Sequence, residues 1–478
     1  MIEKKQFYIN GAWVDPIDGR DHPVIDPSTE EPCAVISLGG QADTNAAVAA
    51  AKAALPGWMA TPVEDRIAAL ERVFEIYQTR MDDLAAAISM EMGAPIDMAK
   101  TQQAPAGFGH LKGFIRAAKA FPWEAPLSDR SPDTRIIHEA VGVCALITPW
   151  NWPMNQITLK VGAALVAGNT MVLKPSEESP LDAMIFAEVM DAAGLPAGVF
   201  NLVNGDGVGV GSQLSSHVDV DMVSFTGSTR AGRLISIAAA DTLKRVHLEL
   251  GGKGANLIFA DADDKAVKRG VLHMMNNTGQ SCNAPSRMLV EASIYDRVVE
   301  EAAAVAAKVT VGPASEEGRH MGPVVNESQW GKIQDLIQKG IDEGARLVAG
   351  GPGRPDGLNK GFYVRPTVFA DVTNDMTIAR EEIFGPVLSI LKFETEEEAV
   401  EIANDTPYGL TNYVQSQDTT RRQRLARQLR SGMVEMNGQS RGPGAPFGGM
   451  KMSGNGREGG SWGIHDFVEV KAASGWND

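Results

Sequence analysis

From Val141 onward, the chain alternates short apolar runs with segments that are each long enough for one helix. The runs have the length and composition of buried strands and occupy residues 144–147, 170–173, 199–203, 222–225 and 246–249. Parallel neighbouring strands need a crossover of about helix length between them. The pattern therefore predicts a parallel sheet with helices packed on its faces.

A second series of the same kind starts near Gly254. We predict strands at 254–259, 286–291, 364–370, 386–393 and 411–415, and helices at 264–276, 294–308, 327–343, 396–404 and 418–430. The two series together predict an α/β chain with two doubly wound units. Folds of this class bind ligands at the carboxyl ends of their strands, so a cleft is expected at the edge of the first sheet.

The segments outside these series have other patterns. Alanine-rich helices are predicted at 43–55, 63–92 and 101–120, with Pro56 and Gly93 among the residues that break them. Residues 121–140 form an extended excursion, and residues 467–471 alternate apolar and polar side chains like a strand. Such an excursion and a terminal strand often serve an oligomer contact, so we expect a homodimer or a homotetramer.

Composition narrows the class of protein. A chain of 478 residues exceeds what one hydrophobic core usually serves, which favours two or three domains. Its formal charge of −16 argues against a nucleic-acid partner. No apolar run reaches the roughly eighteen residues of a membrane helix, so no membrane insertion is expected. Three cysteines without metal-ligand spacing and eight scattered histidines favour a reducing cytoplasm and no bound metal.

Cys282 and Glu249 are the candidates for chemistry. Cys282 stands among small or polar neighbours, which favours an exposed turn, whereas Cys33 and Cys144 are better explained as small buried side chains. Glu249 ends an apolar strand and is followed by two glycines. A solvated strand end is the simpler explanation of Glu249, and the residues alone leave both explanations open. A thiol nucleophile with a carboxylate base would suit covalent catalysis.

Other stretches offer donors to an oxyanion or to a dinucleotide. Asn151 lies in a stiff turn, Thr148-Pro149-Trp150-Asn151-Trp152-Pro153, which suits an amide donor. The glycine-rich run 205–211 does not match the standard dinucleotide fingerprint in any register. Residues 226–229 close a strand and open a helix, where free amides favour phosphate, and Lys174 and Glu177 follow another strand. Each of these signals is weak alone.

Seven motifs, read in order, resemble the aldehyde dehydrogenase superfamily over nearly the whole chain. They are Pro149-Trp150-Asn151-Trp152-Pro153, Lys174-Pro175-Ser176-Glu177, Phe225-Thr226-Gly227-Ser228, Glu249-Leu250-Gly251-Gly252-Lys253, Gly279-Gln280-Ser281-Cys282, Glu381-Glu382-Ile383-Phe384-Gly385-Pro386 and 446–454. The resemblance implies a Rossmann-like cofactor domain (1–120 and 141–250), a catalytic domain (251–450) and a small β oligomerisation extension with the C-terminal tail (121–140 and 451–478).

The resemblance also implies roles for the site residues. Cys282 would attack an aldehyde to give a thiohemiacetal, whose oxyanion is held by the Asn151 amide and the Cys282 N–H. After hydride transfer to the nicotinamide, Glu249 would activate the water that hydrolyses the thioester. By position, Lys160 and Glu458 look like the groups through which the proton of this base leaves. The retained Glu249 argues against the branch of the family that acylates coenzyme A.

The implied cofactor is NAD, with NADP left open. Glu177 would bind the adenosine ribose and repel a 2′-phosphate, although the nearby Arg230 and Ser176 would soften that repulsion. Implied contacts are Ile147, Thr148, Trp150, Lys174, Glu177, Gly207, Gly211, Phe225, Gly227, Ser228, Leu250, Glu382 and Phe384. The small-molecule aldehyde stays unidentified. We expect Arg441 to be a solvated loop residue; the alternative is that it pairs with a carboxylate of the substrate. The competing hypotheses are a cysteine-dependent ester hydrolase and a non-catalytic structural homologue.

Overall fold

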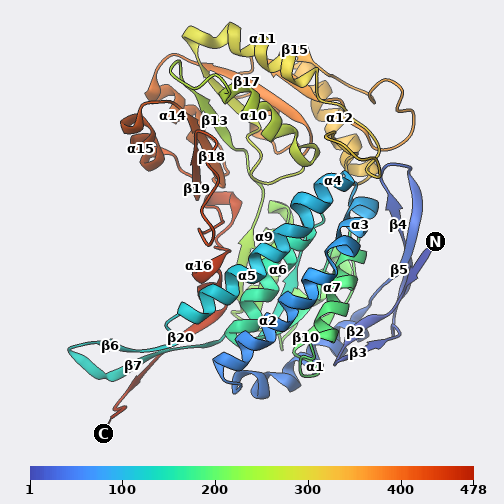
Figure 1. The fold of residues 1–478 in the computed structure, drawn as a ribbon, viewed down its shortest axis with the longest axis vertical. Helices are drawn as coiled ribbons and strands as arrows, with labels where there is room; N and C mark the ends of the chain where they lie inside the picture. The colour runs from blue at the N-terminus through green and yellow to red at the C-terminus, as the bar shows by residue number, and fades with distance from the viewer. Residues whose placement is uncertain (478) are drawn as a thin grey trace.

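Two α/β lobes and a projecting β arm make up the computed structural model, which describes residues 1–477 (Figure 1). The lower lobe in Figure 1 contains a seven-stranded sheet in the order β12-β11-β8-β9-β10-β2-β3. Its strands are β12 (Arg245–Glu249), β11 (Met222–Thr226), β8 (Val143–Ile147), β9 (Thr170–Lys174), β10 (Phe200–Leu202), β2 (Phe7–Ile9) and β3 (Ala12–Val14). The five strands predicted here are present and parallel, while β2 adds antiparallel to β10.

The helices of the lower lobe differ from the prediction at three places. The helix predicted over 63–92 is two helices, α2 (Val63–Thr79) and α3 (Met81–Met92), because Arg80 leaves the helical region at φ −109° and ψ 7°. Helix α1 (Gln41–Met59) continues through Pro56, which stands in the last turn and whose carbonyl still accepts from Ala60 N at 3.2 Å. The helix predicted from residue 101 already begins at α4 (Ile96–Met98) and passes through the π-turn η1 (Ala99–Gln103) into α5 (Ala104–Ala120).

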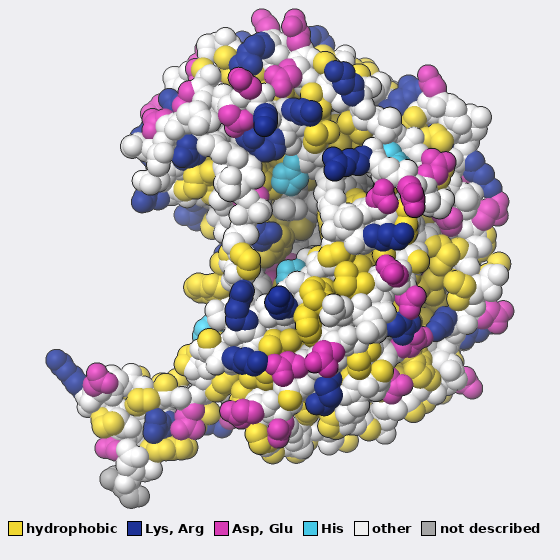
Figure 2. Space-filling view, in the orientation of Figure 1, with side chains coloured by type: hydrophobic (Ala, Val, Ile, Leu, Met, Phe, Trp, Pro, Cys, Tyr) yellow, Lys and Arg dark blue, Asp and Glu magenta, His cyan; other side chains and the backbone are white. Residues whose placement is uncertain are grey.

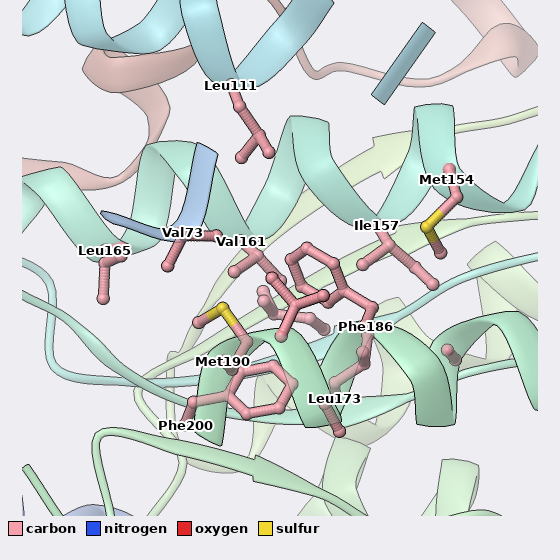
Figure 3. Close-up of a cluster of buried hydrophobic side chains, with 14 of the residues drawn as sticks. Val73, Leu111, Met154, Ile157, Val161, Leu165, Leu173, Phe186, Met190 and Phe200 are labelled. Atoms are coloured by element: carbon pink, nitrogen blue, oxygen red, sulfur yellow. The ribbon is translucent and has the colours of Figure 1, made fainter. Parts of the chain in front are cut away.

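The core of this lobe surrounds α6 (Pro153–Ala167), which the residues between β8 and β9 form as predicted. Every position of α6 except Asn155 is buried, because the sheet lies on one side and α2 and α5 lie on the other. Figure 3 shows side chains from these helices, the sheet and α7 (Leu181–Ala192) meeting, among them Val73, Leu111, Ile157, Val161, Leu173, Phe186, Met190 and Phe200. The remaining helices of the lobe are η2 (Gly207–Gly211), α8 (Ser212–Ser216) and α9 (Thr229–Ala240).

The upper lobe contains the second seven-stranded sheet, ordered β15-β16-β17-β14-β13-β18-β19. All neighbours are parallel except β15 and β16. The strands are β15 (Arg346–Ala349), β16 (Thr367–Ala370), β17 (Val387–Phe393), β14 (Arg287–Glu291), β13 (Ala255–Ile258), β18 (Thr411–Gln415) and β19 (Met433–Met436). The helices are α10 (Ala266–Met275), η3 (Asn276–Gly279), η4 (Ala292–Ile294), α11 (Tyr295–Ala306), α12 (Glu327–Asp342), α13 (Thr377–Arg380), α14 (Glu396–Asn404) and α15 (Thr419–Gln428).

Two smaller sheets complete the fold. The first, β1 (Ile2–Lys4), β5 (Glu31–Leu38) and β4 (Arg20–Asp26), was not predicted, because β1 has only three residues and the side chains of β4 and β5 do not alternate regularly between buried and exposed. The second is the arm: β6 (Glu124–Ser128) and β7 (Ser131–Ala140) pair with the terminal strand β20 (Val468–Ser474) and project from the lower lobe (Figure 1). The short η5 (Lys451–Ser453) and α16 (Gly460–Asp466) precede β20.

No helix in the described part of the chain combines the length and the apolar character needed to cross a membrane. Among residues 1–477, no cluster of three or more histidine, cysteine, aspartate or glutamate side chains is arranged to hold a metal ion.

Candidate active site

Cys282 follows a turn that the backbone adopts at a cost. Asn277, Thr278 and Gly279 have φ values of 51°, 56° and 71°, so three successive residues lie in the left-handed region. For a β-branched threonine this conformation costs on the order of 1–3 kcal/mol. A Cβ at Gly279 would lie 2.2 Å from the Gly385 carbonyl oxygen, so only glycine fits there. Strain of this kind, next to a half-buried thiol, is typical of a functional turn.

Buried amides hold this turn against the Asn151 loop. Asn277 Nδ2 donates to the Asn151 carbonyl at 2.8 Å and to the Gln280 carbonyl at 3.2 Å. Gln103, from η1, donates to the same Asn151 carbonyl at 3.2 Å and to Asn277 Oδ1 at 3.3 Å. The predicted oxyanion donor and the nucleophile turn are therefore fixed to each other. Sequence reasoning missed Gln103 and Asn277, because nothing in their spacing relates η1 to residue 277.

The Asn151 side chain lies at the turn as predicted. Its Nδ2 donates to the Gln280 carbonyl at 3.0 Å, two residues before Cys282, and the side chain is buried. Trp152 Nε1 donates to Ser281 Oγ at 2.8 Å and ties the next residue of each loop together. Asn151 and Cys282 are thus neighbours held by hydrogen bonds on both sides, which is the rigidity that an oxyanion donor needs.

The thiol of Cys282 has no cationic neighbour strong enough to ionise it. Burial raises its pKa well above the ordinary range, and the carboxylates of Glu382, Glu249 and Glu458 raise it further, while Arg441 alone opposes them. Burial and the neighbouring carboxylates thus disfavour the thiolate. A positive charge brought in by a ligand would favour the thiolate.

Glu249 ends β12 as predicted and is 2% exposed. Neither of its carboxyl oxygens has a hydrogen-bond partner among residues 1–477. Burial raises the pKa of Glu249 well above its ordinary range, and Glu458 adds to this effect while Lys160 and Arg457 oppose it. A buried carboxyl with free oxygens is suited to take a proton from a water molecule near neutral pH.

Lys160 and Glu458 form a buried ion pair behind Glu249. Lys160 Nζ lies 2.8 Å from Glu458 Oε1, and the side chains are 0% and 3% exposed. Lys160 comes from α6, whereas Glu458 is held by the antiparallel bridge between residues 447 and 458. The other oxygen of Glu458 has no hydrogen-bond partner within the described chain. The pair lies close enough to Glu249 for both of its charges to act on that carboxyl.

Glu382 lies across the two glycines that follow Glu249. Its Oε1 accepts from Gly252 N at 2.8 Å, and a Cβ on Gly251 would lie 2.3 Å from its Oε2. A Cβ on Gly252 would lie 2.4 Å from the Cys282 carbonyl oxygen. These glycines let the Glu382 carboxylate and the nucleophile turn approach one backbone segment from two sides, and burial raises the pKa of Glu382.

The segment that carries Glu382 and Phe384 is held from α12. Gln329 Nε2 donates to the Ile383 and Phe384 carbonyls at 3.1 and 2.9 Å, and Lys332 Nζ donates to the Glu382 carbonyl at 2.9 Å. Phe384 has a φ of 58°, and its ring lies edge-on to Trp150 at 5.5 Å between centroids. The predicted residues Trp150 and Phe384 therefore meet. Gln329 and Lys332 were not predicted, because their bonds run to main-chain atoms.

The remaining predicted cofactor residues gather at the carboxyl ends of the first sheet. Four of them, Ile147, Gly207, Gly211 and Phe225, line a mostly apolar cavity of about 120 Å³ that also includes Ala231 and Ile235 of α9. Such a slot has the shape and chemistry for an adenine ring. The cavity is bounded by α9, whose first turn is the predicted phosphate site.

The start of α9 keeps its amides near this cavity. Ser228 caps the helix by accepting from Ala231 N at 3.2 Å, and Gly227 N donates to the Glu249 carbonyl at 3.1 Å. A Cβ on Gly227 would lie 2.4 Å from the Phe225 ring. Leu250 is buried, and its N–H donates to the Ser453 carbonyl at 2.9 Å, so its side chain serves packing in this region.

Lys174 and Glu177 meet at the end of β9. Lys174 Nζ lies 3.3 Å from Glu177 Oε2 and donates to the Gly205 carbonyl at 2.5 Å. Burial lowers the pKa of Lys174, and Glu177 opposes this shift. The Glu177 side chain is 29% exposed, so one side of the pair faces outward. Thr148 is buried nearby, and its Oγ1 has no partner among the residues that the structure describes, which leaves a polar atom for a ligand.

Arg441 has a partly exposed side chain that contacts neighbouring side chains. Its Nε donates to Glu435 Oε1 at 3.1 Å, and its guanidinium lies 4.7 Å from the centre of the Phe447 ring. The side chain is neither free in solvent nor aimed at Cys282 by any contact, so a substrate role stays a prediction.

The surface is hollowed between the two lobes on the face shown in Figure 2. A groove of about 1040 Å³ between η1 and α10 reaches Asn277 and Thr278 but none of the residues predicted for catalysis or cofactor binding. The groove thus contacts the turn that precedes Cys282 without including Cys282 itself.

Known proteins resemble this chain in sequence and in fold. The model of the aldehyde dehydrogenase family matches residues 13–473. A crystal structure of an aldehyde dehydrogenase from Bartonella henselae is similar, with 59% identity, a TM-score of 0.98 and coverage of 99% of this chain and 100% of that one. Another, aldehyde dehydrogenase C from Pseudomonas syringae in complex with NAD+ and octanal, has 48% identity, a TM-score of 0.97 and coverage of 99% and 97%.

A curated relative matches this chain over nearly its whole length. The 3-succinoylsemialdehyde-pyridine dehydrogenase of a Pseudomonas species is 50% identical over 478 residues, which covers 100% of this chain and 99% of that protein. The family model and this identity leave no doubt about kinship, and the chain belongs to the aldehyde dehydrogenase family.

Proposed function

We propose that this protein oxidises an aldehyde to a carboxylic acid with NAD(P)+, through a covalent intermediate on Cys282. The observation that carries the proposal is the joining of Cys282, Asn151 and Glu249 from three distant segments. Buried hydrogen bonds fix the first two to each other, and the third is a buried carboxyl with free oxygens. No such arrangement is needed in a structural homologue.

Cys282 would attack the aldehyde carbon, forming a C–S bond while the carbonyl oxygen becomes an oxyanion. The Asn151 amide and the Cys282 N–H would stabilise this oxyanion. The bond from Asn151 Nδ2 to the Gln280 carbonyl shows that the amide is already held beside the turn. When bound, NAD(P)+ accepts the hydride and contributes a cationic ring that favours the Cys282 thiolate.

Glu249 would then remove a proton from the water that hydrolyses the thioester. Its raised pKa makes it a stronger base than an exposed carboxylate, and its free oxygens leave room for that water. The proton passes on toward the ion pair of Lys160 and Glu458, which adjoins Glu249.

The groups that would hold the cofactor fit it along its length. The apolar cavity with Ile147 and Phe225 would take the adenine, the first turn of α9 the phosphates, and Glu382 the nicotinamide ribose beside Phe384. We propose a preference for NAD over NADP, in which the Glu177 carboxylate, partly exposed beside Lys174 at the end of β9, binds the adenosine ribose and repels a 2′-phosphate. Relatives solved with NAD+ support use of this class of cofactor.

We further propose that the arm of β6, β7 and β20 joins copies of the chain into a homodimer or a homotetramer. The arm projects from the body and leaves Leu127, Val470 and Trp476 exposed at 55%, 62% and 46%. Covering apolar side chains on an extended sheet is what an oligomer interface does. A reducing cytoplasm remains our proposed location, because Cys282 must stay a free thiol.

Formation of NADH, followed by absorbance, tests the proposal. The panel of aldehydes should differ in chain length, aromaticity and terminal carboxylate. It should include octanal, with which one relative was solved, and a pyridyl oxo-aldehyde, since another relative is named a 3-succinoylsemialdehyde-pyridine dehydrogenase. The Cys282→Ala variant should form no NADH yet still bind the cofactor. Ester hydrolysis without any NADH from an aldehyde would instead favour a hydrolase.

A further inference from the structure

A continuous line of polar side chains runs from the buried ion pair to the protein surface. Lys160 Nζ donates to Ser224 Oγ at 3.1 Å as well as to Glu458. Ser224 Oγ lies 2.9 Å from His247 Nδ1, and His247 Nε2 lies 3.2 Å from Asp466 Oδ2. The side chains of Lys160 and His247 are 0% and 3% exposed, but that of Asp466 is 34% exposed.

The register of the first sheet creates this line. Strand β11 pairs with β12 so that Ser224 lies opposite His247 and Thr226 opposite Glu249. Since side chains two residues apart on a strand share a face, His247 and Glu249 point to the same side of the sheet. Lys160 reaches that side from α6, which covers it. Asp466 ends α16, just before β20, and so lies toward the outside of the lobe.

We propose that Ser224, His247 and Asp466 conduct to solvent the proton that Glu249 takes from water. The inference rests on the proposed function, and it extends the path beyond Lys160 and Glu458. Three side chains with no contact to substrate or cofactor thereby become part of the turnover.

The transfers balance along this line. Glu249 passes its proton to Glu458. Lys160 gives an N–H proton to Ser224 Oγ and then takes a proton from Glu458. Ser224 then releases its own hydroxyl proton to His247 Nδ1, and His247 releases the Nε2 proton to Asp466. One proton leaves Glu249 and one reaches Asp466, which loses it to water. The line is reset when the Ser224 hydroxyl turns back toward His247 and the ring, now protonated at Nδ1, flips so that its N–H again faces Asp466.

Each link has the acceptor that the transfer needs. Asp466 Oδ2 lies 3.2 Å from His247 Nε2, but the two atoms do not meet the geometry of a hydrogen bond. In the proposed path the ring carries its proton at Nε2, offers the Nδ1 lone pair to Ser224, and turns to bring the N–H onto Asp466 during the transfer. Although burial raises the pKa of Asp466, its contact with His247 and the Arg457 N–H outweigh this, and the lowered pKa favours release to water.

The charges facing His247 are balanced. On its own strand, Arg245 binds the carbonyls of residues 466 and 468, and Glu249 lies on the same face. From the other elements come Lys160 and Glu458, Arg457, and Asp466. Cations and carboxylates thus face the ring together. Gly456 also allows the approach, because a Cβ there would lie 2.2 Å from His247 Nε2.

The test compares His247→Ala and Ser224→Ala with His217→Gln, a control histidine that caps a backbone N–H outside the site. Pre-steady-state NADH formation is measured in H₂O and in D₂O, with and without added imidazole. The acyl-enzyme is also formed from p-nitrophenyl acetate, so that thioester hydrolysis is observed whichever step limits oxidation. Ser224→Ala removes only one hydroxyl, so it should fold even if His247→Ala does not.

In both variants we expect a burst of NADH within about twofold of the native one. Hydrolysis should be slower by about tenfold, less than the hundredfold or more that follows loss of a general base. The solvent isotope effect on hydrolysis should rise, and imidazole should restore hydrolysis in His247→Ala but not in Ser224→Ala. Native hydrolysis in both variants, or slow hydrolysis with an unchanged isotope effect and no rescue, would overturn the path. Absence of NADH from the native enzyme would instead overturn the proposed function.

Discussion

Replacing Glu249 by glutamine separates the chemistry of this carboxyl from its cost to the fold. The substitution keeps the shape and removes the base, so the NADH burst should persist while steady turnover falls by about a hundredfold to ten-thousandfold. The same change removes a carboxyl that is 2% exposed and has no hydrogen-bond partner within residues 1–477. We therefore expect the inactive variant to be the more stable protein at any pH above the unfolded pKa of the carboxyl. At such a pH, folding of the native protein must either bury a charged carboxylate or keep the carboxyl protonated.

The sign follows from the raised pKa of Glu249 in the folded protein. Below the unfolded pKa of about 4.3 both states hold the proton, and the carboxyl costs nothing through ionisation. Above it the unfolded state loses its proton first, so native stability falls with rising pH until the folded pKa is reached. Within that window the stability difference should move in favour of glutamine by about 1.4 kcal/mol per pH unit.

Thermal unfolding from about pH 5 to about pH 8 measures this slope. With an unfolding entropy of about 2.1 cal/mol/K per residue, a chain of this length should gain about 1–2 °C per pH unit relative to the native protein. Glu300→Gln, at an exposed position of α11, is the matched control and should show no such trend. A glutamine variant whose melting temperature parallels the native one at every pH would refute the raised pKa, and loss of the burst would refute the assigned step.

Three further substitutions test the rest of the site. Gly251→Ala places a Cβ 2.3 Å from Glu382 Oε2, so it should break a charged hydrogen bond of about 1.5–3 kcal/mol. Cofactor binding, measured in a titration, should weaken about tenfold or more. The control Gly109→Ala, whose Cβ meets open space, should leave cofactor binding unchanged. Asn151→Ala removes an oxyanion donor and should slow the burst itself about a hundredfold to a thousandfold, and an unchanged burst would exclude this role. Glu177→Gln should shift the ratio of kcat/KM for NADP over NAD upward by about tenfold, and a fixed ratio would contradict our account of cofactor choice.

The sequence predicted the parts of the fold that depend on local pattern. The strands from β8 to β12 and most elements of the upper lobe appeared where apolar runs and helix-length gaps placed them. The errors lie where local pattern is weak. The prediction of one helix over 63–92 failed at Arg80, whose residue type does not signal a break. The strands before residue 39 either have only three residues or, like β4 and β5, lack a regular alternation of buried and exposed side chains.

The site residues that stand in recognisable motifs along the chain could be predicted. Residues that become neighbours only through the fold could not. Cys282 and Glu249 were visible from their glycine-rich surroundings. Gln103 meets Asn277 only because η1 packs against the nucleophile turn, across 174 residues of sequence. His247 was visible as part of a strand, but its serine partner depends on the register between β11 and β12, which no motif encodes.

Buried polar groups in this protein are hard to explain by stability. An ion pair as deeply buried as that of Lys160 and Glu458 rarely stabilises a fold more than apolar side chains of the same volume would, because both charges lose their hydration. Glu249 adds a carboxyl with no partner in the described structure, and Thr278 adds backbone strain. These costs fall on the two sides of one reaction: the strained turn places the sulfur, and the unpaired carboxyl and the ion pair handle a proton. A sequence selected only for a stable core would keep none of them, so their coincidence favours a catalytic protein over a structural one.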